Sequence, residues 1–117
     1  ETKIKRAGAG LVLDLRATED ILASLARRKG RRIVVGFALE TNDGETNARR
    51  KARAKGCDYM VLNEPGPETG FATPTNRITL FKGAKRLFAT PVVSKEEAAR
   101  RIIDALLADR RLGDRRR

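Results

Sequence analysis

The stretch from Ile33 to Lys55 constrains the fold more than any other part of the chain. It begins with a short β-rich apolar run, Ile33-Val34-Val35, which is typical of a buried strand. Gly36 then breaks the run, and its missing side chain would let another backbone or a ligand come close. A polar turn follows, in which Asn42 can cap a helix and Glu45 can reach back to it. Open α/β sheets bind ligands where a strand gives way to a helix, so we expect a ligand first at this turn.

The residues after this turn predict a helix and a second strand. The helix runs from about Asp43 to Lys55 and ends at Gly56. Its only apolar residues are alanines, so we expect it to bury little and to leave its arginines and lysines largely solvated. Residues 58–62 predict a buried strand, which would close a right-handed βαβ unit.

Upstream of this unit the sequence predicts a loop, a strand and a helix. Residues 1–10 are polar and Gly-rich and predict a loop, and Leu11–Leu15 alternate as in a half-buried strand. Thr18 is the expected helix cap, and the helix would end near Gly30. The expected apolar stripe of this helix consists of Ile21, Leu22 and Leu25.

Downstream we expect a long loop over residues 63–74, then a hairpin of residues 77–81 and 86–89. Ser94 and Glu97 have the spacing of a capping box that opens a final helix. The basic tail 110–117 is expected to fray.

The order of elements predicts an α/β fold: a Rossmann-like three-layer sheet with flanking helices and a C-terminal hairpin plus helix. The elements are too few for a complete doubly wound domain, and the chain opens with Glu1 rather than Met. We therefore expect residues 1–117 to form one incomplete half of a larger domain. No Gly-rich phosphate loop of the known nucleotide-binding types is present.

Composition narrows the possible chemistry. Lys and Arg number 26 against 15 Asp and Glu, a net charge of +11, which favours anionic partners or simply reflects solvated arginines. There is no histidine, so catalysis would rest on Lys, Asp or Glu, backbone amides and positioning, and we expect no protein-held metal. The single cysteine fits a reducing compartment such as the cytoplasm, and no apolar run approaches the roughly 20 residues that span a membrane.

An ordered set of motifs carries a family resemblance over nearly the whole chain. The set comprises Lys3-Ile4-Lys5-Arg6, Asp20-Ile21-Leu22, Val35-Gly36-Phe37-Ala38-Leu39-Glu40-Thr41, Ala48-Arg49-Arg50-Lys51 with Lys55, Asn63, residues 76–80 and Ser94-Lys95-Glu96-Glu97. In this order the motifs resemble the C-terminal half of phosphopantothenoylcysteine synthetase. In bacteria that synthetase is usually the second half of a bifunctional coenzyme A biosynthesis flavoprotein.

The resemblance implies an α/β homodimer that catalyses a two-step ligation. CTP with Mg²⁺ would activate the carboxylate of 4′-phosphopantothenate as an acyl-cytidylate, releasing pyrophosphate. The amine of cysteine would then attack, giving the amide and CMP. FMN is expected only if a decarboxylase domain lies upstream. Phosphoryl-group chemistry of this kind depends on positioning and charge neutralisation, which a chain without histidine can supply.

The resemblance also assigns site residues. It places Lys3 at the nucleotide and in the second step as the catalytic residue, and Glu19, Asp20, Ile21 and Leu22 at the nucleotide through the start of a helix. The family usually has proline at the position of Glu19. Phe37 would contact the base, with a core aromatic as the alternative, and Lys51 and Lys55 would hold the triphosphate from one helix face. Gly36, Ala38 and Asn63 are possible additional contacts.

Two features argue against parts of this assignment. Lys51 lies roughly 13 Å down its helix at 1.5 Å per residue, which is far from the strand ends. Glu64 stands where the family often has Asp. The N-terminal half of the family, which carries a Gly-rich nucleotide loop and an Asn that holds the intermediate, is not in this chain, so we expect the 117 residues alone to be inactive.

The alternative function is a small basic nucleic-acid-binding module without catalysis. The net charge, the cluster 27–32, the helix 49–55 and the arginine tail favour it. An aromatic content of 4% leaves few platforms for stacking on bases, and there is no helix-turn-helix or zinc spacing.

Overall fold

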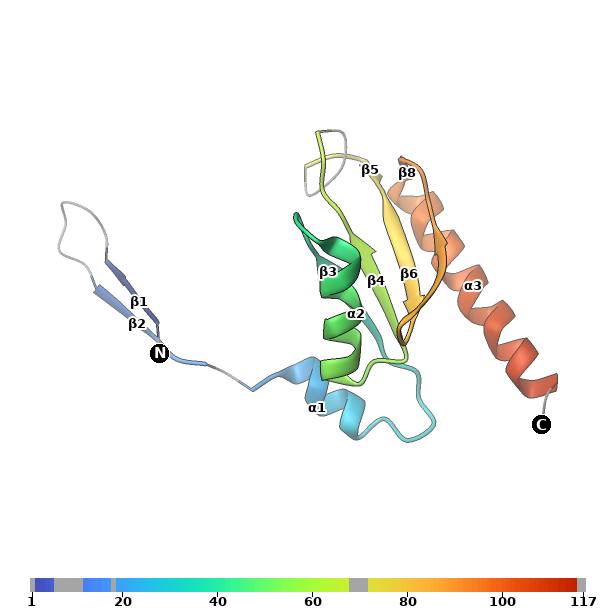
Figure 1. Cartoon of the computed structure of the whole chain (residues 1–117), viewed down its shortest axis with the longest axis horizontal. Coiled ribbons are helices and arrows are strands. Elements are labelled where there is room, and N and C mark those ends of the chain that lie inside the picture. Colours follow the sequence, from blue (N-terminus) through green and yellow to red (C-terminus); the bar gives the residue numbers. More distant parts are fainter. Residues whose placement is uncertain (1, 6–11, 18, 68–71, 116–117) are drawn as a thin grey trace.

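A mixed four-stranded sheet in the order β3-β4-β6-β7 forms the centre of the protein (Figure 1). The computed structural model describes residues 2–5, 12–17, 19–67 and 72–115, with side chains between residues 12 and 110. The four strands comprise Val35–Leu39, Tyr59–Asn63, Ile78–Lys82 and Lys85–Ala89. β3 and β4 run parallel, whereas β6 is antiparallel to both β4 and β7. The predicted βαβ unit and hairpin are confirmed.

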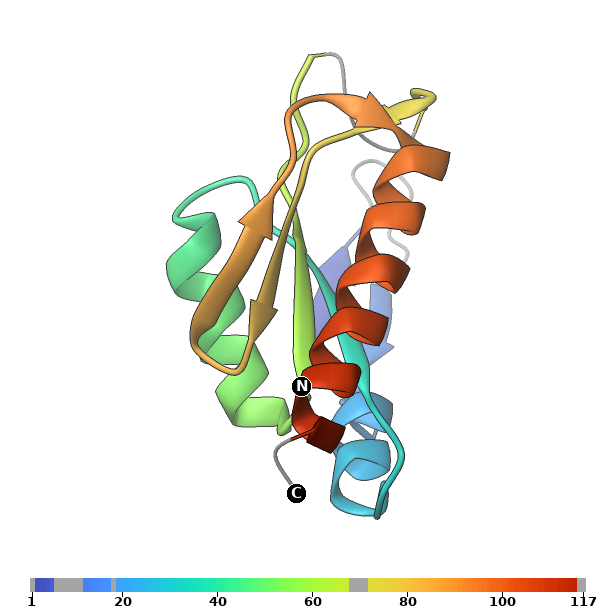
Figure 2. The same cartoon turned by 90° about the vertical axis from the view of Figure 1, so that its right-hand side faces the viewer.

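Helices cover both faces of this sheet. α2 (Gly44–Lys55) lies on one face and α3 (Lys95–Arg115) on the other (Figure 2). α1 (Ile21–Arg27) packs on the core beneath α2 through Leu22. Alternation along β4 explains the two layers, because successive side chains point to opposite faces. Met60 and Leu62 pack in the cluster under α2, while Tyr59 and Val61 pack in the cluster under α3. The three-layer α/β fold is therefore as predicted.

α2 contacts the sheet through small side chains. Ala48 and Ala52 are fully buried in the core, so the helix backbone approaches the sheet closely while burying little side-chain volume. Arg49 is less solvated than predicted: its guanidinium carbon lies 5.0 Å from the ring centre of Phe81, and its Nε donates to the Ala84 carbonyl oxygen at 3.0 Å.

Gly36 lies inside β3, so the predicted break in the strand is wrong. A Cβ at this position would lie 2.9 Å from Met60 Cε, 3.0 Å from Cys57 Sγ and 3.1 Å from Leu22 Cδ2. Glycine is therefore required here for the packing of α1 and β4 on β3, and not for a turn.

α1 is shorter and less buried than predicted. Its N-cap is Asp20, whose Oδ1 accepts a hydrogen bond from the Ala23 amide at 3.1 Å; Thr18, the predicted cap, lies outside the described residues. The helix ends at Arg27 and does not continue to Gly30. Within the expected apolar stripe only Leu22 packs on the core, because Ile21 and Leu25 are 70% and 51% exposed.

An antiparallel hairpin of β1 (Thr2–Lys5) and β2 (Val12–Leu15) extends away from the sheet (Figure 1). The predicted loop is thus wrong for residues 2–5, and residues 1 and 6–10 lie outside the described part. β2 is a strand as predicted, but all four of its residues are exposed, so its predicted half-burial is wrong.

β5 (Thr75–Asn76) and β8 (Val93–Ser94) pair antiparallel beside the start of α3. α3 stays helical to Arg115, so the predicted fraying from residue 110 is wrong over that range, and residues 116–117 lie outside the described part. In the described part of the chain no helix is long and apolar enough to cross a membrane.

Ser94 caps α3, because its Oγ accepts a hydrogen bond from the Glu97 amide at 3.0 Å. The carboxylate of Glu97 accepts from Arg100 and Arg101 further along the helix. We expect Ser94→Ala to lower the free energy of unfolding by about 1 kcal/mol, measured by urea denaturation. Ser94→Asp should restore most of the loss, and an unchanged midpoint for Ser94→Ala would show that the cap contributes nothing.

Tyr59 anchors α3 to the sheet. Its hydroxyl donates to Asp109 Oδ2, and Lys82 Nζ lies 2.8 Å from the same oxygen. Burial, followed by the bond to Asp109, raises the pKa of Tyr59 to about 12. Because the folded pKa exceeds that of the unfolded chain, the resulting stability is present below about pH 10 and lost as the pH rises towards 12.

Tyr59 is the only tyrosine in the chain, so tyrosinate absorbance reports on it alone. We expect a titration midpoint near pH 12 in the folded protein, and a lower midpoint in Asp109→Asn. A midpoint near 10 in protein that circular dichroism shows to be folded would contradict the buried anchor.

Candidate functional site

The candidate site lies where β3 and β4 end side by side. The Glu40 amide donates to the Asn63 carbonyl oxygen at 3.1 Å, which extends the parallel ladder one residue beyond the pairing of Leu39 with Asn63. The chain then turns and enters α2 at Gly44. The predicted arrangement of strand, polar turn and helix start is therefore present, at the edge where parallel sheets bind ligands.

The start of α2 differs from the predicted capping pattern. The N-cap is Asp43, in the left-handed region with φ 48°, and its side chain makes no capping bond. The carbonyl of Asn42 instead accepts a bond from the Asn47 side chain at 3.0 Å. The carboxylate of Glu45 turns to Arg49 at 3.5 Å. The left-handed residue places Asn42 one position outside the helix, so the predicted Asn42–Glu45 capping is wrong.

Glu64 packs against the first turn of α2. A Cβ on Gly44 would lie only 2.7 Å from Glu64 Oε2, so glycine is needed for the carboxylate to come this close. A carboxylate is favoured there by the positive end of the helix. The helix start thus already has an anion beside it.

Lys51 reaches the end of β3 despite its distance along the helix. Its Nζ lies 2.5 Å from Glu40 Oε1, an ion pair whose angle departs from hydrogen-bond geometry. Side chains on a helix tilt towards its N-terminus, which brings the ammonium group back to the strand end. Lys51 therefore reaches the strand end although it lies far along the helix. Glu40, which directly follows the strand, is a candidate that sequence reasoning missed.

Lys55 joins α2 to the start of α1. Its Nζ lies 2.5 Å from Asp20 Oδ2, and Asp20 is at the same time the cap of α1. The bond from Lys55, followed by the bond from the Ala23 amide, lowers the pKa of Asp20. The structure therefore brings the predicted Glu19–Leu22 segment and one predicted nucleotide lysine together.

Phe37 lies on the opposite face of the sheet from these lysines. Gly36 and Ala38 point towards α1 and α2 and are buried, so the intervening Phe37 points to the face of α3. Its side chain is 70% exposed, so it is not the core aromatic of the alternative interpretation. Phe37 and Lys51 are therefore not brought together on one face of the sheet.

Asn63 presents an unsatisfied polar atom at this edge. Its Oδ1 is buried and has no hydrogen-bond partner among the described residues, an exception that calls for a ligand or water. No group of three His, Cys, Asp or Glu side chains in the described part could hold a metal by itself. Mg²⁺ at nucleotide sites is held largely by phosphate oxygens with one or two carboxylates, so such a group is not needed for an ion that a triphosphate carries.

The other predicted site residues are only partly described. Lys3 pairs with Asp14 in the hairpin, and its side chain lies outside the described part. Glu19 is exposed beside Asp20. Because the hairpin extends away from the sheet, the structure does not bring Lys3 next to Lys51 and Lys55 within one chain (Figure 1).

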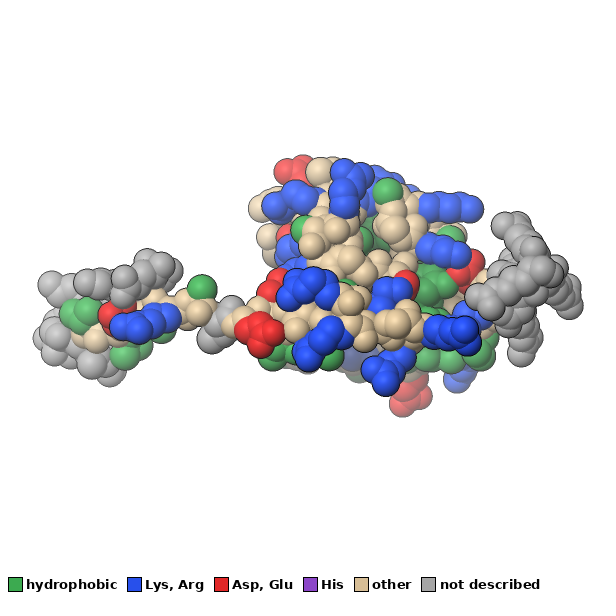
Figure 3. Space-filling model, turned by 90° about the horizontal axis from the view of Figure 1, so that it is seen from below, with side chains coloured by type: hydrophobic (Ala, Val, Ile, Leu, Met, Phe, Trp, Pro, Cys, Tyr) green, Lys and Arg blue, Asp and Glu red, His purple; other side chains and the backbone are tan. Residues whose placement is uncertain are grey.

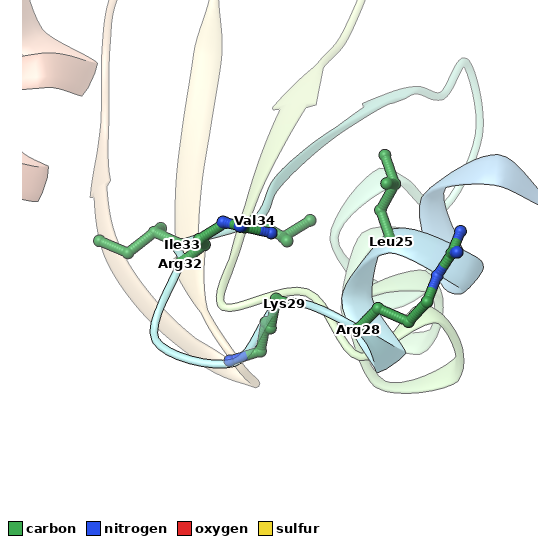
Figure 4. A pocket seen from close by; sticks show the side chains of 6 residues that line it. All are labelled: Leu25, Arg28, Lys29, Arg32, Ile33 and Val34. Carbon is green, nitrogen blue, oxygen red and sulfur yellow. The ribbon is translucent and has the colours of Figure 1, made fainter.

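A hollow of about 470 Å³ lies at the other end of the sheet, between the end of α1 and the residues before β3 (Figure 4). Apolar side chains and three cations line it, namely Leu25, Ile33, Val34, Arg28, Lys29 and Arg32. Lys29 is held there by Asp58 at 2.9 Å. The hollow is at the amino end of β3, away from the end of β3 that Lys51 reaches.

Lys and Arg side chains are numerous on the face that Figure 3 presents. Figure 3 shows Lys and Arg side chains interspersed with acidic and apolar groups on the face that it presents. On α2, Arg50 donates to the Asn47 side chain, and Lys51 and Lys55 pair with carboxylates. Two cations of the basic helix on which the nucleic-acid alternative partly depends, Lys51 and Lys55, are thus paired with carboxylates within the fold.

Comparison with known proteins decides the family. The family model described as the DNA/pantothenate metabolism flavoprotein C-terminal domain matches residues 1–109. The chain belongs to this family. A coenzyme A biosynthesis bifunctional protein CoaBC from Bacillus subtilis is 38% identical over 109 residues, and one from Mycobacterium tuberculosis H37Rv is 34% identical over 116. A cysteine/cysteine sulfinic acid decarboxylase from an unidentified prokaryote is 41% identical over 109 residues.

These matches cover most of this chain but little of the relatives. They span 90–92% of the chain and only 26–30% of the curated proteins. The crystal structure of the C-terminal domain of a CoaBC protein superposes with a TM-score of 0.65 at 31% identity, covering 83% of this chain and 46% of that one. The flavoprotein from Streptococcus pneumoniae, with a TM-score of 0.62 at 16% identity, shares the fold. The chain therefore corresponds to part of the synthetase domain of coenzyme A biosynthesis.

Proposed function

We propose that this chain is the C-terminal part of a cytoplasmic phosphopantothenate–cysteine ligase that uses CTP with Mg²⁺. The observation that carries the proposal is the placement of Lys51 and Lys55. Lys51 reaches the end of β3, and Lys55, one turn further along the same helix, reaches the start of α1, in a chain of this family. Two ammonium groups on one helix face suit a polyphosphate.

In the proposed reaction, binding of CTP first replaces the carboxylate partners of the two lysines, and covalent bonds form afterwards. The triphosphate of CTP would displace Glu40 and Asp20 from the two lysines, while Glu64 keeps the phosphates away from the helix start. An oxygen of the 4′-phosphopantothenate carboxylate then attacks the α-phosphorus, and the bond to the β-phosphate oxygen breaks, releasing pyrophosphate. The cysteine amine attacks the acyl carbon next, giving the amide, CMP and a proton. The lysines act by neutralising charge on the phosphates.

Completion of the site requires more than this chain. Lys3, as the catalytic residue of the second step, lies on the hairpin, and we propose that the hairpin brings it to a site of the homodimer. The chain spans 46% of the solved relative, so we also propose that the rest of the homologous domain supplies the other wall. FMN would belong to a decarboxylase domain outside these residues.

The test is pyrophosphate release from CTP with 4′-phosphopantothenate and cysteine. We expect release by the complete domain, meaning this chain together with the rest of the homologous domain, and none by the 117 residues alone. Release by the isolated chain would overturn the proposal that this chain holds only part of the site. No release by the complete domain would overturn the proposed ligase function. Salt-sensitive binding of RNA or DNA without thermal stabilisation by CTP would favour the nucleic-acid alternative.

A further inference from the structure

Glu40 carries the least exposed carboxylate among the ion pairs in the described part of the chain. Its side chain is 14% exposed, whereas the acids of the other pairs there are 23–47% exposed. Its Oε1 is buried and accepts no hydrogen bond from the described residues. Lys51 is the only described cation within ion-pair distance of it. A charge held away from water is costly unless an opposite charge compensates it, so Glu40 depends on Lys51.

The nearest acid along the sheet cannot take the place of Lys51. Glu64 follows β4 as Glu40 follows β3, and the ladder between the two strands extends to the Glu40 amide. Glu40 contacts Lys51 of α2, and Glu64 packs against Gly44 at the start of the same helix. Both carboxylates therefore lie on the face that α2 covers. This pair, which we call the carboxylate corner, repels phosphates and favours a cation, although the chain as a whole carries +11.

Nucleotide binding would remove the partner of Glu40. In the proposed function the triphosphate takes Lys51 and Lys55 from their carboxylates. Asp20, the partner of Lys55, is 47% exposed, so water can solvate it once the lysine has turned away. Glu40 is too buried for that, and it would be left without a counter-charge. The carboxylate corner thus needs a new cation at the stage when CTP is bound.

We propose that Glu40 binds the ammonium group of the incoming cysteine. A primary ammonium group has a full positive charge and three N–H donors. It therefore supplies both a counter-charge and a hydrogen bond for the buried Oε1. The described part of the chain has no group of three His, Cys, Asp or Glu side chains that could hold a metal ion by itself, which favours an ammonium ion over a metal. This assignment rests on the proposed function, which supplies the cysteine.

An order of binding follows from this assignment. In the free domain cysteine competes with Lys51 for Glu40, whereas in the CTP complex Glu40 is open to it. CTP should therefore tighten the binding of cysteine by at least about tenfold. Mercaptopropionate has the thiol and the carboxylate of cysteine but no ammonium group, so its binding should be unchanged by CTP.

Calorimetric titration of the complete domain measures this coupling. Cysteine is titrated with and without CTP and Mg²⁺, and 4′-phosphopantothenate is left out so that no reaction occurs. Glu40→Gln should abolish the tightening by CTP. Glu45→Gln is the matched control, because it removes a more exposed carboxylate from the first turn of α2, and it should retain the tightening.

Steady-state and single-turnover kinetics separate Glu40 from its neighbour Lys51. Glu40→Gln should raise KM for cysteine by at least about tenfold. It should change single-turnover pyrophosphate release by less than about threefold, because Lys51 is still present to hold the triphosphate. Glu40→Asp keeps the charge and should recover part of the KM, which distinguishes lost charge from lost folding.

Three results would overturn the subsite and leave the ligase function standing. They are an unchanged KM for cysteine in Glu40→Gln, equal tightening of cysteine and mercaptopropionate by CTP, and a raised requirement for Mg²⁺ in place of a raised KM for cysteine. The last result would assign Glu40 to a metal ion. Absence of pyrophosphate release by the unaltered complete domain would overturn the ligase function and the subsite together.

Discussion

Lys51→Met in the complete domain is expected to lower kcat/KM for CTP by about 100- to 1,000-fold. Lys51 is the cation that reaches the end of β3, and its loss would leave both Glu40 and the incoming phosphates without a counter-charge. Methionine keeps most of the length and apolar surface of the lysine stem, so the packing of α2 should survive. Steady-state pyrophosphate release over a range of CTP concentrations gives the value.

Lys85→Met is the control for this experiment, because it removes an exposed cation from β7, at the edge of the sheet opposite β3. It should change kcat/KM by less than about twofold, since exposed charges far from a site are screened by salt. A Lys51→Met enzyme that is as active as the Lys85→Met enzyme would remove Lys51 from the site.

Phe81→Ala is expected to lower the free energy of unfolding of the 117-residue chain by about 4 kcal/mol. Phe81 is the largest fully buried side chain, and it lies between β6 and α2 in the cluster that includes Met60 and Leu62. Its removal leaves a cavity that the alanines of α2 are too small to fill. A loss of this size is comparable to the whole stability of a small domain, so extensive unfolding at room temperature is an expected outcome.

Two further variants show where the loss comes from. Phe81→Leu should cost less than half as much, because most of the volume is kept. Arg49→Ala removes the guanidinium over the ring and should cost about 0.5–1 kcal/mol from that contact. Urea unfolding measures all three, and a loss below about 1 kcal/mol for Phe81→Ala would show that the core does not depend on the ring.

The central elements of the fold could be predicted because their signals are local. An apolar run such as Tyr59-Met60-Val61-Leu62, bounded by Gly56 and a turn, predicts a buried strand wherever it stands. The alternation and turn of the β6–β7 hairpin are equally self-contained. The loop prediction for residues 2–5 is wrong because these residues form a strand only by pairing with Val12–Leu15. Their polar composition does not indicate that pairing.

The errors around β3 have a tertiary cause. Gly36 predicted a break, whereas the side chains of Met60, Cys57 and Leu22 need the space that it leaves inside the strand. Asn42 had the right residue type for a cap, but the left-handed turn at Asp43 moved it out of position. Neither fact can be read from a local pattern, because each depends on how neighbouring elements meet.

The sequence predicts individual residues of the candidate site, whereas the structure shows two of them in ion pairs. The family resemblance named Lys51 and Lys55 without their partners, and no local pattern joins Lys51 with Glu40 or Lys55 with Asp20. The structure supplies those pairs and removes the distance problem for Lys51. It also separates Phe37 from the lysines by one face of the sheet, so its predicted stacking on the base stays a prediction.

Lysine acetylation followed by mass spectrometry tests most directly the proposal that Lys51 and Lys55 bind the triphosphate. In the complete domain, saturating CTP with Mg²⁺ should slow the labelling of Lys51 and Lys55 by at least about tenfold, because their amines would be covered by phosphates. Lys85 should label at an unchanged rate and serves as the internal control. Labelling of Lys51 and Lys55 that is unchanged at CTP concentrations supporting full activity would contradict the account.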